Sequence, residues 1–160
     1  MDTTTPTPPT ARTARDLRAG WEQLLDPPDH DGHSLWILVV DGDTRRLTSL
    51  LHQVADLPST PTPGDAAQLE RFLAQLAASV LRDRHRVAIA LRRRGGPLPD
   101  GADLRWIETV YEACDAVEAP CETVHLVGDA GAFPVTRAEV RAARAAQRGR
   151  VARSSSTTAS

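Results

Sequence analysis

The sequence has 160 residues, of which 41% are hydrophobic, and this is enough for one domain with a core of its own. No apolar run reaches about 18 residues, the length that spans a bilayer, and the amino terminus lacks the apolar segment of a secretory signal. We therefore expect a cytoplasmic protein that does not bind membranes. The formal net charge of −2 argues against general affinity for nucleic acid, although all 19 basic residues are arginine.

The two ends of the chain are poor in apolar side chains. Residues 1–12 are mostly Thr and Pro, and residues 153–160 are mostly Ser and Thr. Such segments cannot bury enough apolar surface to fold, so both are predicted to be disordered tails. Between them, residues 13–135 are predicted to form a single domain with a short amino-terminal helix, and residues 136–152 a basic helix.

The first elements are a helix and a hairpin. A helix is predicted over residues 13–25, where apolar residues recur at helical spacing before two prolines. Residues 35–40 (LWILVV) form an unbroken apolar run that suits a strand buried on both faces. Residues 47–54 follow a turn and predict the second strand of a hairpin. The apolar face of the helix consists of Leu17, Trp21, Leu24 and Leu25.

A second helix is predicted to begin at Asp65, with Gln68 at capping-box spacing. Residues 87–91 (VAIAL) predict another buried strand, and a loop leads from it into a helix that ends near Cys114. The apolar stripe of the second helix consists of Leu69, Phe72, Leu73, Leu76 and Val80.

The last third of the chain predicts a strand over residues 121–127 and a short return strand over residues 133–135. Thr136 and Glu139 then form a capping box for the basic helix. Alternating strands and helices predict an α/β fold in which a layered mixed sheet is flanked by helices.

The loop after residues 87–91 contains Gly95, Pro97 and Pro99, and Asp103 follows in the next helix. Their spacing resembles the RadC branch of the JAB/MPN proteins, whose motif runs His-x-His-Pro-Ser-Gly, then Pro, then Pro-Ser-x-x-Asp. The segment 35–47 and the hairpin near residues 126–135 are also similar to that family. The resemblance covers residues 33–135 and implies a JAB/MPN (cytidine-deaminase-like) architecture.

The chemistry of that family needs two histidines and an aspartate on zinc, and a glutamate that moves a proton. Here the histidine positions fall on Ala90 and Arg92, the serine on Asp100 and the glutamate on His33, while Asp103 is kept. Alanine has no donor atom and arginine is a permanent cation. The resemblance therefore implies a degenerate member that has lost its metal ligands, with no catalytic residue, metal or cofactor.

Two hypotheses account for Asp103. Asp100 and Asp103 have the spacing of an N-cap residue and its N3 partner, so Asp103 can serve as a helix cap. Alternatively, Arg92 takes the place of the lost metal and pairs with Asp103. The candidate binding residues that remain are His33, Arg92, Arg93, Arg94, Asp100 and Asp103.

Three functions stay open. The first is a non-catalytic interaction or regulatory module that binds a protein partner. The second is a metal-dependent, isopeptidase-like hydrolase with a rearranged site built from Asp103, His33 and another histidine. The third is binding of an anion or nucleic acid through the run 92–94 and the last helix, although Asp100 and Asp103 would neutralise that loop. The last helix itself is either a solvated arm or a docking element for an acidic partner.

Overall fold

The computed structural model describes residues 11–25, 32–79 and 85–156, so most of both predicted tails and the helix residue Val80 lie outside the described residues. Each helix and strand predicted within the described ranges is present, and the fold is α/β as predicted. In chain order the elements are α1 (Ala14–Leu24), β1 (His33–Val40), β2 (Leu47–Leu57), α2 (Pro63–Ser79), β3 (Arg86–Arg92), α3 (Gly101–Ala116), β4 (Val124–Gly128), β5 (Gly131–Val135) and α4 (Arg137–Ser156).

The strands form one mixed sheet in the order β2-β1-β3-β4-β5. Strand β1 pairs antiparallel with both β2 and β3, β3 pairs parallel with β4, and β4 pairs antiparallel with β5. Parallel neighbours need a crossover connection, and α3 supplies it between β3 and β4. The start of α3 is thereby placed beside the end of β3.

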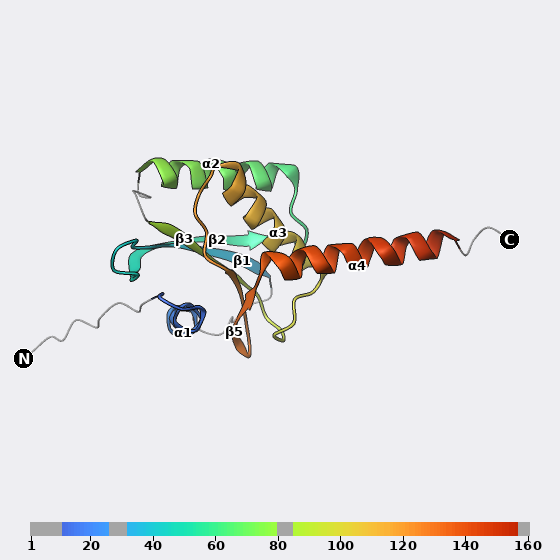
Figure 1. The fold of residues 1–160 in the computed structure, drawn as a ribbon, viewed down its shortest axis with the longest axis horizontal. Helices are drawn as coiled ribbons and strands as arrows, with labels where there is room; N and C mark the ends of the chain where they lie inside the picture. The colour runs from blue at the N-terminus through green and yellow to red at the C-terminus, as the bar shows by residue number, and fades with distance from the viewer. Residues whose placement is uncertain (1–10, 26–31, 80–84, 157–160) are drawn as a thin grey trace, which may run out of the picture.

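Helices cover both faces of the sheet (Figure 1), with α2 and α3 on one side and α1 on the other. Side chains alternate between the faces of a strand, so Ile89 and Leu91 of β3 pack in the core beneath α2 and α3. Ala88 and Ala90 belong to the second core, which faces α1. This alternation decides which residues of β3 can reach α3.

Helix α1 is held by its cap and by two buried side chains. Thr13 and Asp16 form a capping box, and Leu17 and Trp21 are buried against the sheet. Leu24, predicted on the apolar face, is instead 42% exposed. Ala11, which lies before the predicted domain boundary at residue 13, is buried, and its N–H donates to the carbonyl of Arg45.

Two helix boundaries differ from the prediction. The cap of α2 is the Thr62–Asp65 pair, in which each residue accepts a hydrogen bond from the other's N–H, so the Asp65–Gln68 box was wrong. Pro63 fits directly after such a cap because its missing N–H would have no helical partner. At the other end, α4 continues to Ser156 through residues predicted as a tail. Within the described ranges, no helix combines the length and the apolarity that a bilayer crossing needs.

Candidate functional site

Asp103 lies at the start of α3 and is completely buried. Its N–H donates to Oδ1 of Asp100 over 2.8 Å, and the N–H of Asp100 donates to Oδ2 of Asp103 over 2.9 Å. These two bonds satisfy N–H groups that the first turn of a helix leaves without partners. The predicted cap formed by Asp100 and Asp103 is confirmed, but capping is not the only role of Asp103, because a cation also contacts its carboxylate.

The cation that faces Asp103 is Arg93. Its Nε lies 3.2 Å from Oδ1 and 3.0 Å from Oδ2 of Asp103, and its Nη2 lies 2.7 Å from Oδ2. Nη1 also donates to the carbonyls of Arg94 and Gly96, and Nη2 donates to that of Leu98. A guanidinium has five N–H donors, and these contacts engage all three of its nitrogen atoms. Arg93 therefore ties the loop over residues 93–100, hereafter the Arg93 loop, to α3.

The hypothesis that Arg92 pairs with Asp103 was wrong, and the alternation of β3 explains why. Ala90 faces α1, and Arg92, two residues further, points to the same side with its guanidinium over the ring of Trp36 at 5.9 Å. Leu91 and Arg93 point to the other side, toward α3. Placing the family motif without a gap put both histidine positions on the face turned away from Asp103.

His33, the first residue of β1, completes the cluster. Its Nε2 lies 3.0 Å from Oδ1 of Asp103, so the structure joins two residues that stand 70 positions apart in the sequence. Burial acts to raise the pKa of Asp103, but hydrogen bonds from Arg93, from the N–H of Asp100 and from His33 outweigh it and lower the pKa. The carboxyl group is thus a buried carboxylate with its own permanent counter-ion.

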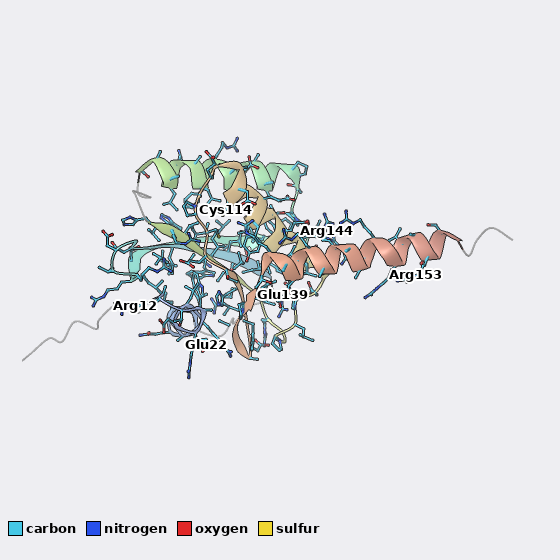
Figure 2. The ribbon with its side chains drawn as sticks, in the orientation of Figure 1. Arg12, Glu22, Cys114, Glu139, Arg144 and Arg153 are labelled. Atoms are coloured by element: carbon cyan, nitrogen blue, oxygen red, sulfur yellow. The ribbon has the colours of Figure 1, made fainter. Side chains whose placement is uncertain are left out.

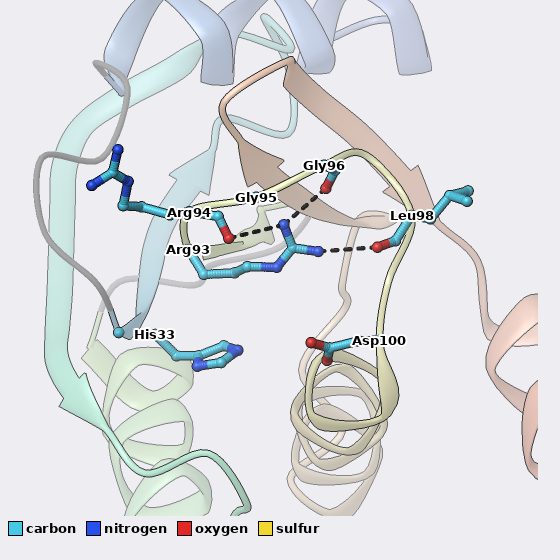
Figure 3. A pocket seen from close by; sticks show the side chains of 8 residues that line it. His33, Arg93, Arg94, Gly95, Gly96, Leu98 and Asp100 are labelled. Carbon is cyan, nitrogen blue, oxygen red and sulfur yellow. Dashed lines mark hydrogen bonds between the residues drawn. The ribbon is translucent and has the colours of Figure 1, made fainter.

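An open pocket of about 410 Å³ lies beside this cluster (Figure 3). Gly32 and His33 border it at the start of β1, and the Arg93 loop supplies the rest of its wall. Leu98 is 82% exposed at this loop. The N–H of Gly95 donates to Oδ2 of Asp129, which fastens the loop to the turn between β4 and β5. The lining residues are Gly32, His33, Arg93, Arg94, Gly95, Gly96, Leu98 and Asp100.

Five of the six predicted binding residues therefore gather at one place: four line the pocket, and Asp103 lies in direct contact with three of them. Arg92 does not join them. Across the described ranges, no group of three or more His, Cys, Asp or Glu side chains is placed to hold a metal ion. The arrangement keeps the carboxyl group of Asp103 in its charged form. It can present backbone groups, the imidazole edge of His33 and the exposed side chain of Arg94 to a ligand.

Sequence reasoning did not find two polar features outside this cluster. His125 of β4 is fully buried on the face toward α1, and its ring Nδ1 lies 3.0 Å from the carbonyl of Thr123. The hydroxyl of Tyr111 donates to the carbonyl of Val135 and accepts from the N–H of Val124. A histidine inside an apolar strand and a tyrosine on a helix face carry no local signal of their partners.

Comparison with known proteins adds no family or relative. No protein-family model matches the chain, and no curated protein is significantly similar to it.

Proposed function

We propose that this chain is a degenerate JAB/MPN-like domain related to the RadC branch, and that it acts by binding rather than by catalysis. The order of the elements supports the relation, because a buried strand, a glycine- and proline-containing loop and a helix with an early aspartate follow one another. His33 and Asp103, which the resemblance places at the family's glutamate and metal-binding aspartate, lie in contact. Fold resemblance alone does not establish a function, so the argument rests on the site.

The observation that carries the proposal is the state of Asp103. Its carboxylate is engaged by the guanidinium of Arg93, by His33 and by the N–H of Asp100. A zinc ion would have to displace a permanent cation that is itself 7% exposed and bonded to three loop carbonyls. Zinc hydrolysis needs an open metal position that holds a water molecule, and Arg93 fills the space next to the aspartate.

The binding surface that we assign to this module is the open pocket with the Arg93 loop. Leu98 offers an exposed apolar side chain at one end of the loop, and Arg94 offers an exposed cation at the other end, pointing away from Leu98 (Figure 3). A loop that carries both an exposed apolar side chain and an exposed arginine is the kind of surface that a protein segment recognises. The internal bonds of Arg93 hold the loop in one shape, which lowers the entropy lost on binding.

Zinc content of the purified, untagged protein tests the proposal. The protein is dialysed against excess zinc and then against buffer, and the metal is measured by inductively coupled plasma mass spectrometry. We expect the wild-type protein to hold no stoichiometric zinc. We expect Arg93→His to gain zinc, because an imidazole would then face His33 and Asp103 and complete a set of three ligands.

The matched control is Arg92→His, which adds the same imidazole on the opposite face of the sheet and should gain no zinc. Near-stoichiometric zinc in the wild-type protein would overturn the proposal. Zinc uptake by Arg92→His, without uptake by Arg93→His, would show that the ligand face has been assigned wrongly.

One observation favours the second candidate, an isopeptidase-like metal-dependent hydrolase with a rearranged site. The 3.0 Å contact between His33 and Asp103 already brings two possible zinc ligands together. That function requires Arg93 to leave the carboxylate when metal binds. Zinc in the wild-type protein, together with its loss in both His33→Ala and Asp103→Asn, would select this candidate and lead to peptidase assays.

A further inference from the structure

Helix α4 is longer than the surface on which it packs. Its first half lies against α3, where Val140 is buried and two ion pairs join the helices. These pairs are Arg137 with Asp115 and Arg144 with Glu108. The second half runs clear of the domain (Figure 1), and Figure 2 shows Arg144 near the body and Arg153 close to the far end.

Helix α4 as a whole is strongly basic, and its projecting half contains Arg148, Arg150 and Arg153. Residues 137–156 contain six arginines and one glutamate and therefore carry a formal charge of +5. Because the whole chain carries −2, the remaining residues carry −7. Arg141, Arg148 and Arg150 are exposed and have no acidic partner among the residues that the structure describes. An anionic partner would thus be drawn to the helix and repelled by the body.

The exposed arginines do not lie on one side of the helix. Successive residues are about 100° apart around an α-helix, so Arg141 and Arg148 share one side, while Arg150 lies about 200° from Arg148. A flat acidic protein surface could meet only one of these sides. A polyanion whose charges line both walls of a groove could meet both.

A partner that grips the helix through apolar side chains does not fit this segment. Recognition of a helix in a protein groove uses apolar anchors at three- and four-residue spacing. After Val140, which already packs on α3, the only large apolar side chain in α4 is Val151, which is 67% exposed. The other residues are mostly Ala, Arg and Ser.

We propose that α4 binds duplex DNA by lying in the major groove, with Arg141, Arg148 and Arg150 on the phosphates of both walls. The major groove of B-DNA is wide enough for an α-helix, whereas that of duplex RNA is too narrow. This activity is independent of the Asp103 site, and zinc content neither supports nor opposes it.

The salt dependence of DNA binding gives the test. The full-length protein is titrated into a short fluorescein-labelled DNA duplex of mixed sequence, and anisotropy is followed at several salt concentrations. Three phosphate contacts predict an affinity that falls about 40-fold between about 50 and 200 mM salt. The double variant Arg148→Ala/Arg150→Ala keeps only the contact of Arg141. Its affinity at about 50 mM salt should be lower than that of the wild-type protein, and it should fall only about fourfold between about 50 and 200 mM salt.

The matched control is Arg12→Ala/Arg71→Ala, which removes the same two charges from exposed positions of the body. It should keep the wild-type affinity and salt slope. Circular dichroism of the three proteins at low salt shows whether the variants stay folded, so a loss of binding can be assigned to the lost charges.

Three outcomes would overturn the proposal. The first is absence of DNA binding at about 50 mM salt, where the electrostatic attraction is strong. The second is an equal loss of affinity in the control variant. The third is sedimentation that shows salt-sensitive self-association through Arg148 and Arg150 without DNA binding, which would assign the helix to the acidic surface of a second copy.

Discussion

The guanidinium of Arg93 and the carboxylate of Asp103 lie edge to edge, with Nη2 2.7 Å from Oδ2 and Nε 3.2 Å from Oδ1. This forked geometry gives two hydrogen bonds along one charged contact. The two residues are 7% and 0% exposed, so water cannot replace either partner. The pair joins the end of β3 to the first turn of α3 and makes the Arg93 loop part of the core.

Breaking this pair should cost far more than removing both charges. Arg93→Met leaves a buried carboxylate without its cation and is expected to lower the free energy of unfolding by about 3–5 kcal/mol. In Arg93→Met/Asp103→Asn no charge remains, and the amide can still accept from the N–H of Asp100. We therefore expect the double variant to be more stable than the single one in urea unfolding.

Arg92→Met is the control for that comparison. It removes a cation over the ring of Trp36, a contact worth about 0.5–1 kcal/mol at a partly exposed site. A loss in Arg92→Met as large as that in Arg93→Met would contradict the assignment of the buried ion pair.

The buried ring of His125 should make the protein less stable in mild acid. Burial lowers the pKa of His125 from the ordinary 6.5, the charge of Arg18 lowers it further, and the Thr123 carbonyl and Glu22 oppose these effects. The unfolded chain then binds more protons, so stability is present above about pH 6.5 and is lost as pH falls toward the lower folded pKa. His125→Leu should remove this dependence of the free energy of unfolding on pH, as measured by unfolding the protein at several pH values between about 8 and 5.

His52, which is exposed on β2, provides the comparison for His125. His52→Gln should keep the acid-dependent loss of stability. If His125→Leu keeps the wild-type slope and His52→Gln removes it, the buried histidine is not the group that titrates.

Tyr111 should stay protonated to high pH and should stabilise the end of the sheet. Burial is the main cause that raises the pKa of Tyr111 to about 12. Its stabilising effect is present below the unfolded pKa of about 10 and is lost as pH rises toward 12. Tyr111 is the only tyrosine of the chain, so phenolate absorbance reports on it alone.

Tyr111→Phe should lower the free energy of unfolding by about 1–3 kcal/mol, because the buried N–H of Val124 loses its acceptor. Phenolate absorbance that appears near pH 10, while circular dichroism still reports a folded protein, would show that the hydroxyl is open to water.

Replacing Gly131 should weaken the docking of α1. A Cβ at this position would lie 2.6 Å from Oε1 of Glu22, and the backbone φ of +117° also favours glycine. The same Oε1 accepts from the N–H of Ala132 and from Nε of Arg18, so displacing it disturbs several contacts. Gly131→Ala should cost about 1–3 kcal/mol and expose α1 to proteases.

The control for Gly131 is Gly96→Ala, since nothing lies within 4 Å of a Cβ at that position. Adding Glu22→Ala to Gly131→Ala removes the clash but not the backbone strain, so the double variant should lose less than the sum of the two single losses. If the loss of stability in the double variant equals the sum of the two single losses, the carboxylate of Glu22 does not contact residue 131.

The order of helices and strands followed from local patterns, because apolar periodicity and capping pairs act within a few residues. The Asp100–Asp103 cap could be predicted for that reason. The Thr62–Asp65 cap carried the same signal, and it was missed because Asp65 was taken as the cap and not as its partner. Where a helix meets solvent, as at Ser156, sequence preference alone does not set its end.

The partner of Asp103 was predicted one residue away from its true position. Val87, Ile89 and Leu91 alternate with Ala88 and Ala90, so the larger side chains already marked the face toward the helices. Following that alternation from Leu91 leads to Arg93. The contact with His33 had no local signal, since it depends on how β1 and β3 pair across the sheet.

Arg93 places a positive charge beside the buried carboxylate of Asp103, and because this charge belongs to the chain it does not depend on a bound ion. A bound ion can be removed by a chelator, exchanged for another ion or absent when the chain folds. A guanidinium carried by the chain is synthesised with its partner in a fixed ratio and does not diffuse away. Folding around Asp103 is therefore expected to proceed equally well in metal-starved and metal-rich cells.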